Sequence, residues 1–386
     1  MRDFDYSIPT KVYFGKGRLG ELKRIAEFGK TVLLVYGGGS IKSSGLYAEI
    51  CKILTDCTIN IIELSGVEPN PRIQSVRKGI TLCKEHKVDV VLAVGGGSVI
   101  DCSKVIASGS KYSGDPWDFT KDFSLIKDAL PLVTILTHAA TGSEMNGTAV
   151  ISDMTINDKM PIRHELHRPK FSILDPEYTY SVPLYQLGAG ICDTMCHAME
   201  NFFTSCDSAF IQDGICLTLI KACIKYGPIA LKDPKNYEAR ANLMWASSLA
   251  INGLCSFGAA DVWTAHFIEH ELSAFYDIAH GAGLAIVMPQ WMSYVLGDST
   301  VEKFARYARE VFSVSPQKDL FEQAREGIEK TATFFASMGM PLKLSEVGID
   351  QTHFAEMAEL SMRIIGKNCY VPLTAEDVKK ILISSL

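Results

Sequence analysis

The stretch Val88–Ala107, VDVVLAVGGGSVIDCSKVIA, joins a fully apolar run, three glycines with a serine, and a stretch with helical spacing. A second passage has the same order, because the apolar run Thr31–Tyr36 ends in GGGS at positions 37–40. Strands that are apolar on both faces and alternate with helices are typical of a parallel sheet covered on both sides. These two passages therefore predict an α/β fold.

The character of the sequence changes near Pro183. Before it, two further apolar runs at Asn60–Leu64 and Leu132–Leu136 extend the predicted sheet. After it, we find only long periodic stretches that indicate helices. These cover residues 190–206, 208–226, 236–255, 262–275, 283–296, 299–313, 317–338 and 351–365, and a last helix follows Thr374, with Asp377 as a capping-box acid. We therefore predict an α/β domain at residues 1–182 and an all-helical domain at residues 183–386.

The composition excludes several classes of protein. With 44 acidic and 38 basic residues among 386, the chain has no basic excess for broad binding to nucleic-acid phosphates. Its 47% hydrophobic content is ordinary for a globular protein. The eleven cysteines are odd in number and form no CxxC motif, so we expect reduced thiols in the cytoplasm. The start, MRDFDYSIPTK, has no apolar core, and polar residues interrupt the apolar stretch 281–297, so we expect neither a signal peptide nor a membrane span.

The two glycine loops are the first chemical signal. Glycines after a strand let the backbone approach a phosphate, and the helix that follows directs N–H groups at the anion. Gly95, Gly96, Gly97 and Ser98 lie directly between a strand and a helix, although Ile100 stands where the dinucleotide fingerprint has its third glycine. Two plain βα turns are the alternative. The repetition of GGGS after two strands favours a phosphate site.

A cluster of histidines in the second half predicts a metal site. Asp193 and His197 are four residues apart, which places both on one face of a helix and offers a cation mixed oxygen and nitrogen ligands. His266 and His270 repeat this spacing, and His280 follows. A packed histidine or a local Asp–His hydrogen bond is the alternative for each pair.

The spacing of the last three histidines requires a break in the chain. An unbroken helix would separate residues 266 and 280 by about 21 Å, too far for one ion. If both bind, the chain must turn back near Asp277 or at the pair His280-Gly281. Spacing alone does not say which of the three histidines bind.

A competing motif overlaps this cluster. His266, Glu269 and His270 match H-x-x-E-H, a metallopeptidase signature in which the histidines bind zinc and the glutamate is the general base. The pattern is short, and it leaves the glycine loops and the Asp193/His197 pair without a role. We therefore favour it less.

Longer segments carry a resemblance to a known family. They are PTKVYFGKGRL at 9–19, EPNP at 68–71, GGGSVIDCSK at 95–104, THAATGSEMN at 137–146, ILDPEYTYSVP at 173–183, GICDTMCHAMENFF at 190–203 and HFIEHELSAFYDIAHG at 266–281. With these segments the sequence resembles the iron-containing (group III) alcohol dehydrogenases. YSGDPWD at 112–118 and YGGGS at 36–40 are most similar to the branch of butanol dehydrogenases and broad-specificity aldehyde reductases.

The resemblance implies a Rossmann-like NAD(P)-binding domain at residues 1–182 and a helical metal-binding domain at residues 183–386, with the site in the cleft. It implies four metal ligands, Asp193, His197, His266 and His280, and it places His270 beside the nicotinamide. The implied cofactor contacts are Gly37, Gly38, Gly39, Ser40, Asn70, Gly95, Gly96, Gly97, Ser98, Asp101, Thr137, Thr141, Lys159 and Thr179. His138 stands where relatives often have an aliphatic residue.

We therefore expect an alcohol dehydrogenase or aldehyde reductase that transfers hydride between NADP(H) and a primary alcohol or aldehyde such as butanol or butanal. The metal would be Fe(II) or Zn(II), and we expect a cytoplasmic homodimer with a small-molecule substrate and neither nucleic acid nor membrane as partner. NADPH is the expected cofactor, because the stretch Gly37–Gly39 offers no acid to repel a 2′-phosphate, while Ser40 and Lys42 could bind one. The alternatives are a zinc-dependent glycerol or polyol dehydrogenase, a dehydroquinate synthase-like lyase, the H-x-x-E-H metallopeptidase and a non-catalytic nucleotide sensor.

Overall fold

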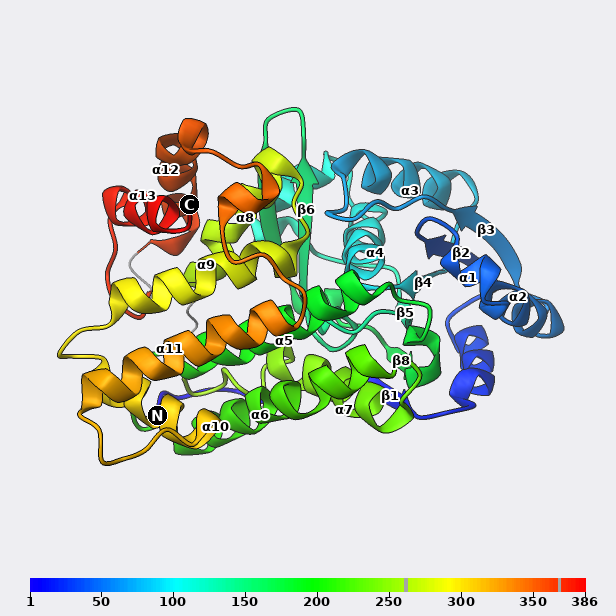
Figure 1. Ribbon diagram of the computed structural model, residues 1–386. Helices are drawn as coiled ribbons and strands as arrows, with labels where there is room; N and C mark the ends of the chain where they lie inside the picture. Colours follow the sequence, from blue (N-terminus) through cyan, green and yellow to red (C-terminus); the bar gives the residue numbers. More distant parts are fainter. Residues whose placement is uncertain (260–262, 367–368) are drawn as a thin grey trace. The chain divides into compact units, whose positions relative to one another are not determined.

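The computed structural model describes residues 1–259, 263–366 and 369–386 (Figure 1). Backbone contacts divide the chain into two compact units. The α/β unit comprises Ser7–Val182 and Lys235–Ser248, and the helical unit comprises Met1–Tyr6, Pro183–Pro234 and Leu249–Leu386. Each unit is described here by itself.

A parallel sheet of six strands forms the centre of the α/β unit. Its strands are β1 Lys11–Phe14, β2 Thr31–Tyr36, β3 Asn60–Leu64, β4 Val90–Gly95, β5 Leu132–Leu136 and β8 Phe171–Leu174, in the order β1-β8-β5-β4-β2-β3. Leu33 and Val35 of β2 pack on the core of one face, and Val32 and Leu34 pack on the core of the other. Burial on both faces explains why these strands read as continuous apolar runs.

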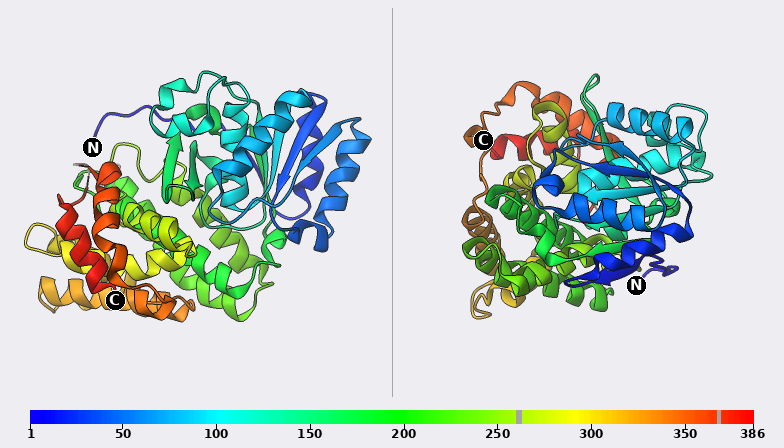
Figure 2. Two further views of the ribbon diagram at one scale, coloured as in Figure 1. Left: turned by 90° about the horizontal axis from the view of Figure 1, so that it is seen from above. Right: turned by 90° about the vertical axis from the view of Figure 1, so that its right-hand side faces the viewer.

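Helices cover both faces of this sheet (Figure 2). The α-helices of the unit are α1 Ser40–Ser43, α2 Leu46–Asp56, α3 Ile73–Glu85, α4 Gly97–Gly109 and most of α7 Tyr237–Ile251, and its 3-10 helices are η1 Arg18–Glu27, η2 Pro116–Thr120, η3 Phe123–Leu125, η4 Ser143–Met145, η5 Glu165–His167 and η6 Pro176–Thr179. Residues of α3 and α4 belong to one core, and Leu46, Ile50 and Leu54 of α2 belong to the other. The predicted α/β fold is confirmed.

Three of the four predicted strands have the expected bounds, and the fourth is Val90–Gly95 rather than 88–94. The sequence did not predict β1, β8 or the antiparallel hairpin of β6 Thr148–Asp153 and β7 Asp158–Arg163. β1 and β8 are four residues long, which is too short to show a pattern, and β7 contains Pro161. Such segments find their place through tertiary pairing rather than through local sequence.

The helices that the periodicity predicts are present, and all of them except α7 lie mainly in the helical unit. Its α-helices are α5 Leu184–Phe202, α6 Phe210–Lys232, α8 Thr264–Tyr276, α9 His280–Val295, α10 Val301–Phe312, α11 Leu320–Ser337, α12 Phe354–Ile365 and α13 Ala375–Ser384, with short 3-10 helices η7 Leu344–Val347 and η8 Gln351–His353. The expected capping box of Thr374 and Asp377 opens α13. The expected break is also confirmed, because α8 ends at Asp277 in the left-handed conformation (φ 52°) and α9 begins at His280.

Two segments, Met1–Tyr6 and Lys235–Ser248, do not follow a single division of the chain at residue 182. Each packs in the unit on the other side of that division. In the segment Lys235–Ser248, the Trp245 ring packs edge-on to Phe14 at 5.8 Å, and the Ser248 hydroxyl donates a hydrogen bond to Glu144. Periodicity indicates that this segment is a helix but not which unit it packs against.

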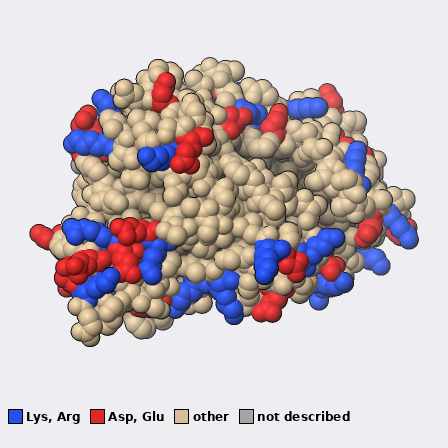
Figure 3. Space-filling view, viewed as in Figure 1, with Lys and Arg blue, Asp and Glu red and all other residues tan. Residues whose placement is uncertain are grey.

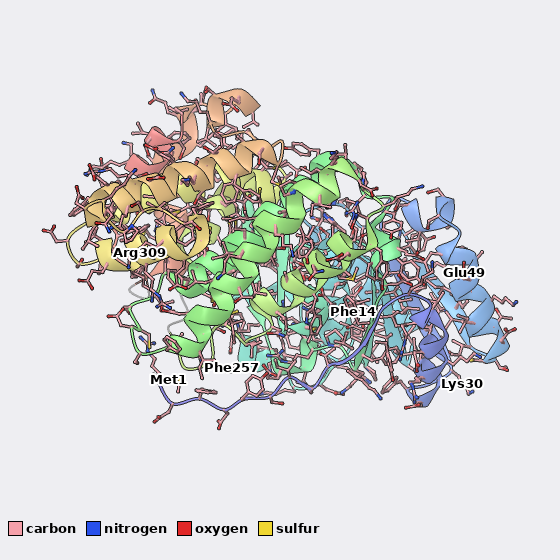
Figure 4. All side chains as sticks on the ribbon, turned by 60° about the horizontal axis from the view of Figure 1, so that its bottom comes forward. Met1, Phe14, Lys30, Glu49, Phe257 and Arg309 are labelled. Carbon is pink, nitrogen blue, oxygen red and sulfur yellow. The ribbon has the colours of Figure 1, made fainter. Side chains whose placement is uncertain are left out.

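The segment Met1–Tyr6 packs in the helical unit. Phe4 and Tyr6 contact the ring of Phe257 at 5.9 and 5.2 Å between centroids. Figure 4 shows this segment passing beside the labelled Phe257.

In the part of the chain that the structure describes, one helix is long and apolar enough, by length and composition alone, to cross a membrane. This is α6, with a mean hydropathy of 1.4 over its most apolar window. Its residues Cys216, Leu217, Ile220 and Cys223 are buried, and the helix packs against α5. Packing within the helical unit accounts for this composition, so the helix is weak evidence for a membrane span.

Charges of both signs lie side by side on α10 and next to α11 (Figure 3). Arg306 pairs with Glu310 at 2.9 Å, and Lys318 pairs with Glu326 at 2.6 Å. Each exposed pair contributes only about 0.2–1 kcal/mol. This face is solvated, and its stability comes mainly from the apolar residues beneath it.

Helix α5 owes its close packing to a glycine. A Cβ atom at Gly188 would lie 2.1 Å from the carbonyl oxygen of Met338, which is a backbone atom and cannot move aside. We expect Gly188→Ala to lower the free energy of unfolding by on the order of 2 kcal/mol. Gly214→Ala on α6 is the matched control, because no atom lies within 4 Å of its added Cβ and helix propensity favours alanine. Thermal unfolding of both variants tests this, and an unchanged midpoint for Gly188→Ala would contradict the packing.

Candidate active site and metal centre

A buried carboxylate oxygen forms the centre of the site in the helical unit. Asp193 Oδ1 lies 3.4 Å from Nε2 of His197, 3.7 Å from Nε2 of His266 and 3.7 Å from Nε2 of His280. Asp193 and His197 lie one turn apart on α5, as their spacing predicts. His266 comes from α8, and His280 is the first residue of α9.

Ligand atoms of Asp193, His266 and His280 lie within 4.8 Å of one another, as a shared divalent cation requires, and His197 Nε2 lies beside them at 3.4 Å from Asp193 Oδ1. Two ligands at about 2.1 Å from one ion in tetrahedral geometry are about 3.4 Å apart, close to the separations found here. Asp193 Oδ1 and His266 Nε2 are buried without a hydrogen-bond partner among the described residues. Unpaired buried polar atoms are costly, and a shared cation would satisfy both. The structure thus brings together the four residues predicted as ligands.

Two further carboxylates hold the imidazoles from behind. Nδ1 of His266 donates a hydrogen bond to Glu200, which also accepts from the backbone N–H of Ala265 at 2.8 Å. Nδ1 of His280 donates to Glu269, which also accepts from Ser273 Oγ at 2.5 Å. Both glutamates are at most 1% exposed. Such carboxylate–histidine pairs fix the ring so that Nε2 faces the ion.

The electrostatics of the cluster favour a positive charge. Burial by itself would raise the pKa of Asp193, but the imidazoles of His197, His266 and His280 outweigh it and hold this pKa below its usual range. Burial lowers the pKa of His266, but Glu200 and Asp193 outweigh it and raise the value to about 9. The field of carboxylates that favours a proton here equally favours a metal cation.

His270 lies outside the group around Asp193. Its ring centroid is 5.6 Å from that of His280, and it is 5% exposed. Glu269, His270 and His280 form a second group of possible ligands, whose ligand atoms lie within 4.8 Å of one another. That group is a weaker candidate for an ion, because Glu269 already accepts the Nδ1 hydrogen bond of His280.

The metallopeptidase alternative does not fit this geometry. Glu269 is fully buried, and its two oxygens accept hydrogen bonds from Ser273 and His280. A general base must reach a water molecule next to the metal. In this structure Glu269 instead accepts a hydrogen bond from the His280 imidazole, so the role of general base that the motif assigns to it does not fit.

Sequence reasoning missed Glu200, although a signal was present. Glu200 follows His197 by three residues on α5, so the two side chains lie on neighbouring positions of one helix face. A buried acid on the same face as two ligands is a candidate for the outer layer of a metal site. We had no reason from spacing alone to connect it with His266, which is 66 residues away.

The residues predicted to contact a cofactor follow the carboxyl ends of the strands in the α/β unit. From β2 the chain moves outward to β3, then returns to β4 on the other side of β2 and continues to β5. The direction of strand addition therefore reverses between β2 and β4. Ligands of open α/β sheets bind at such a reversal, outside the carboxyl ends. The glycine loops 37–40 and 95–98 follow β2 and β4, so they flank this point.

Glycine is required in the second loop by close packing. A Cβ atom on Gly97 would lie 2.3 Å from Thr141 Oγ1, and one on Gly96 would lie 3.0 Å from the Cβ of His138. Gly96 caps α4, which begins at Gly97. The helix N-terminus and the segment after β5 are thus held together, and His138 packs directly on the predicted phosphate loop.

The other predicted cofactor residues differ in their burial and in the hydrogen bonds that their side chains already form within the protein. Lys159 Nζ donates to Asn70 Oδ1 at 3.1 Å, so these two lie together. Asp101 is buried and accepts from Ser143 Oγ at 2.5 Å and from Val150 N at 2.9 Å. Asp101 thus ties α4 to its neighbours. Thr179 Oγ1 is buried and donates to the carbonyl of Pro176, whereas Thr137 and Thr141 are half-buried beside the loop.

Comparison with known proteins agrees with this arrangement. The profile of the family described as iron-containing alcohol dehydrogenase matches residues 9–176, and the profile of its C-terminal domain matches residues 188–386. The chain belongs to the iron-containing alcohol dehydrogenase family. The family implies a nicotinamide cofactor and a divalent metal, and the protein is an NAD(P)-dependent oxidoreductase.

Individual members of the family are similar over the whole chain. NADH-dependent butanol dehydrogenase A of Clostridium acetobutylicum is 52% identical, with all of both chains covered. NADPH-dependent aldehyde reductase YqhD of Escherichia coli is 36% identical, covering 95% of this chain and 96% of that protein. The crystal structure of NADH-dependent butanol dehydrogenase A from Thermotoga maritima has a TM-score of 0.94 at 36% identity, covering 100% of this chain and 99% of that one. These relatives identify an alcohol dehydrogenase or aldehyde reductase and use both cofactors between them.

The metal centre predicts a graded response to substitution. We expect His280→Ala to lose bound metal and nearly all activity, because it removes one of four ligands and leaves Glu269 without its imidazole partner. Glu269→Gln should keep the ligand set but weaken metal binding by roughly 10- to 100-fold. Metal content after dialysis and competition with a chelator measure both effects. Full metal content and normal turnover in His280→Ala would refute the ligand assignment.

Proposed function

We propose that this protein reduces primary aldehydes such as butanal to alcohols with NADPH, and oxidises the alcohols in the reverse direction. The observation that carries the proposal is the convergence of three imidazoles on the buried oxygen of Asp193. It is joined by two glycine loops at the reversal point of a parallel sheet. A metal centre and a dinucleotide site each supply one half of a hydride transfer.

Asp193, His197, His266 and His280 would hold the metal, and Glu200 and Glu269 would orient two of these ligands. When bound, the metal acts as a Lewis acid that polarises a carbonyl group. A bound nicotinamide would supply or accept the hydride, and the protein would orient it. Iron(II) and zinc(II) both suit imidazole and carboxylate, and we propose one of these two.

His270 is the proposed proton relay. Its imidazole lies next to His280 but outside the group of ligand atoms around Asp193. Histidine is the side chain whose ordinary pKa suits proton transfer near neutral pH. In reduction, a ring nitrogen of His270 would pass a proton toward the alcohol oxygen as it forms.

NADPH is the proposed cofactor because of the first glycine loop. Gly37–Gly39 carries no acid to repel a 2′-phosphate, and a Cβ on Gly38 or Gly39 would meet no atom within 4 Å. The loop therefore has space for the additional phosphate. The relatives include both NADH-dependent and NADPH-dependent enzymes, so this preference must be measured on the protein itself.

The cytoplasm and a homodimer remain our proposals for location and assembly. All eleven cysteines are free in the structure, in keeping with a reducing compartment. A polyol substrate is the nearest alternative, since 1,3-propanediol dehydrogenase of Citrobacter freundii is 28% identical over 94% of this chain. Oxidation of the reduced cofactor during incubation with butanal, compared with glycerol oxidation in the reverse assay, separates the two. A protein that consumes no cofactor with either substrate would contradict the proposal.

The role of His270 gives a test that contrasts with that of His280. We expect His270→Ala to retain its metal, because the residue is not a ligand, but to lower turnover and change the dependence of turnover on pH. Metal analysis and kcat measured over a range of pH check this. If His270→Ala lost metal as severely as His280→Ala, His270 would be a ligand and the proposed division would be wrong.

The first glycine loop gives a test of cofactor choice. We expect the unmodified protein to have the higher kcat/KM with NADPH, and Gly38→Asp to shift the ratio toward NADH, because a carboxylate binds the ribose 2′-hydroxyl and repels a 2′-phosphate. The variant should fold normally, since the added side chain meets no atom near its Cβ. The measurement is kcat/KM for both reduced cofactors with one aldehyde. An NADH preference in the unmodified protein would show that another residue governs the choice.

A further inference from the structure

Four side chains next to the first glycine loop form a connected set, in which only Lys42 has so far been given a role. We call it the Glu63 cluster: Tyr36 at the end of β2, Lys42 on α1, Tyr47 on α2 and Glu63 on β3 (Figure 1). The hydroxyl of Tyr36 donates to Glu63 Oε2 at 2.6 Å, and that of Tyr47 donates to Glu63 Oε1 at 2.5 Å. Both carboxylate oxygens are therefore held.

Lys42 completes the cluster without a hydrogen bond to the carboxylate. Its Nζ lies 5.1 Å from the ring centre of Tyr36 and 4.7 Å from that of Tyr47, within range of cation–π attraction. It lies 3.9 Å from Glu63 Oε2, too far for a hydrogen bond. The side chain of Lys42 is 52% exposed. The ammonium group is thus positioned by ring faces and by charge, and solvent or an anion can still reach it.

The chain connects this cluster directly to the proposed cofactor loop. Tyr36 immediately precedes Gly37, and the backbone N–H of Lys42 donates to the carbonyl of Gly39 at 2.9 Å. Lys42 thus begins three residues after the loop glycine Gly39 on the same backbone turn, with its ammonium group beside Tyr36, the residue that precedes Gly37.

The negative charge of Glu63 acts on the same ammonium group of Lys42. Hydrogen bonds from Tyr36 and Tyr47 lower the pKa of Glu63, so it is a carboxylate at neutral pH. A phosphate monoester carries a charge of about −2 near neutral pH, whereas a ribose hydroxyl carries none. A carboxylate beside Lys42 therefore weakens the attraction of this site for a 2′-phosphate and leaves the attraction for a 2′-hydroxyl almost unchanged.

We propose that Glu63 is a specificity-determining residue: it holds Lys42 against the two tyrosine rings and offsets its charge, which limits the preference for NADPH over NADH. The inference rests on the proposed function, because it requires the adenosine ribose to lie at the loop 37–40. Glu63 places a carboxylate beside the loop 37–40, which itself contains no acidic residue. It acts through Lys42 rather than through a bond to the ribose, since both of its oxygens already accept hydrogen bonds.

The test measures dissociation constants of NADPH and NADH for the metal-loaded protein and three variants. Glu63→Gln should bind NADPH roughly threefold more tightly, an effect of the size expected for one exposed charge, and should bind NADH as before. Lys42→Met should weaken NADPH alone. In the double variant, Glu63→Gln should have less effect on NADPH than in the unmodified protein, because the lysine through which it acts is absent. Glu49→Gln on α2 removes an exposed charge outside the cluster and should change neither constant.

Several outcomes would overturn the inference. Equal changes for both cofactors in Glu63→Gln would mean that the residue only supports the fold, and an unreduced effect in the double variant would mean that it does not act through Lys42. If Glu63→Gln failed to fold, an unchanged NADPH/NADH ratio in Lys42→Met would still refute the inference. An NADH preference in the unmodified protein would overturn the proposed cofactor but not this inference, whose readout is the change in the ratio. Absence of binding of either nucleotide would overturn both.

Discussion

The burial of Asp193 is the constraint on which the helical unit depends. A carboxylate inside a helix bundle is costly unless other groups compensate its charge. Three imidazoles converge on it, and Glu200 and Glu269 in turn bind two of those imidazoles. Each of these carboxylates adds a negative charge, so the described side chains compensate the charge of the cluster only in part. A divalent metal is the group that compensates the whole set at once, and this links the stability of the unit to its chemistry.

Close helix packing brings His280, the last of the predicted ligands, to this centre. A Cβ atom on Gly281 would lie 2.0 Å from the carbonyl oxygen of Ala189, and one on Gly283 would lie 2.7 Å from Glu269 Cγ. Helix α9 can therefore begin against α5 and α8 only because these positions are glycines. The left-handed residue Asp277 ends α8 and lets the chain reverse. The separation of 3.7 Å between His280 and Asp193 follows from this backbone geometry rather than from the histidine itself.

The sequence predicted those site residues whose pattern lies within a short segment of the chain. The spacing of Asp193 and His197 places them on one helix face, and the distance along the chain from His266 to His280 requires the break that Asp277 provides. The sequence could not rank the three later histidines, because helical spacing treats them alike, and only the fold shows that Nε2 of His266 and His280 lie 3.7 Å from Asp193 Oδ1. Strands β1 and β8 were not predicted for a related reason. A strand of four residues is positioned by its neighbours in the sheet rather than by a pattern of its own.

The two GGGS loops show how identical tetrapeptides can differ in function. In the second loop, Gly97 lies so close to Thr141 that a side chain would displace the segment after β5. In the first loop, an added side chain at Gly38 or Gly39 would meet open space, and charged residues lie at its edge. The second loop is thus constrained by packing at Gly96 and Gly97, whereas the first is open at Gly38 and needs glycine at Gly39 because of its φ of 109°. If the two loops hold the cofactor as proposed, a change of charge beside the first loop would alter recognition of the ribose and leave the packing of Gly97 against Thr141 in the second loop intact. On that proposal, cofactor choice would be separable from cofactor binding because each would depend on a different loop.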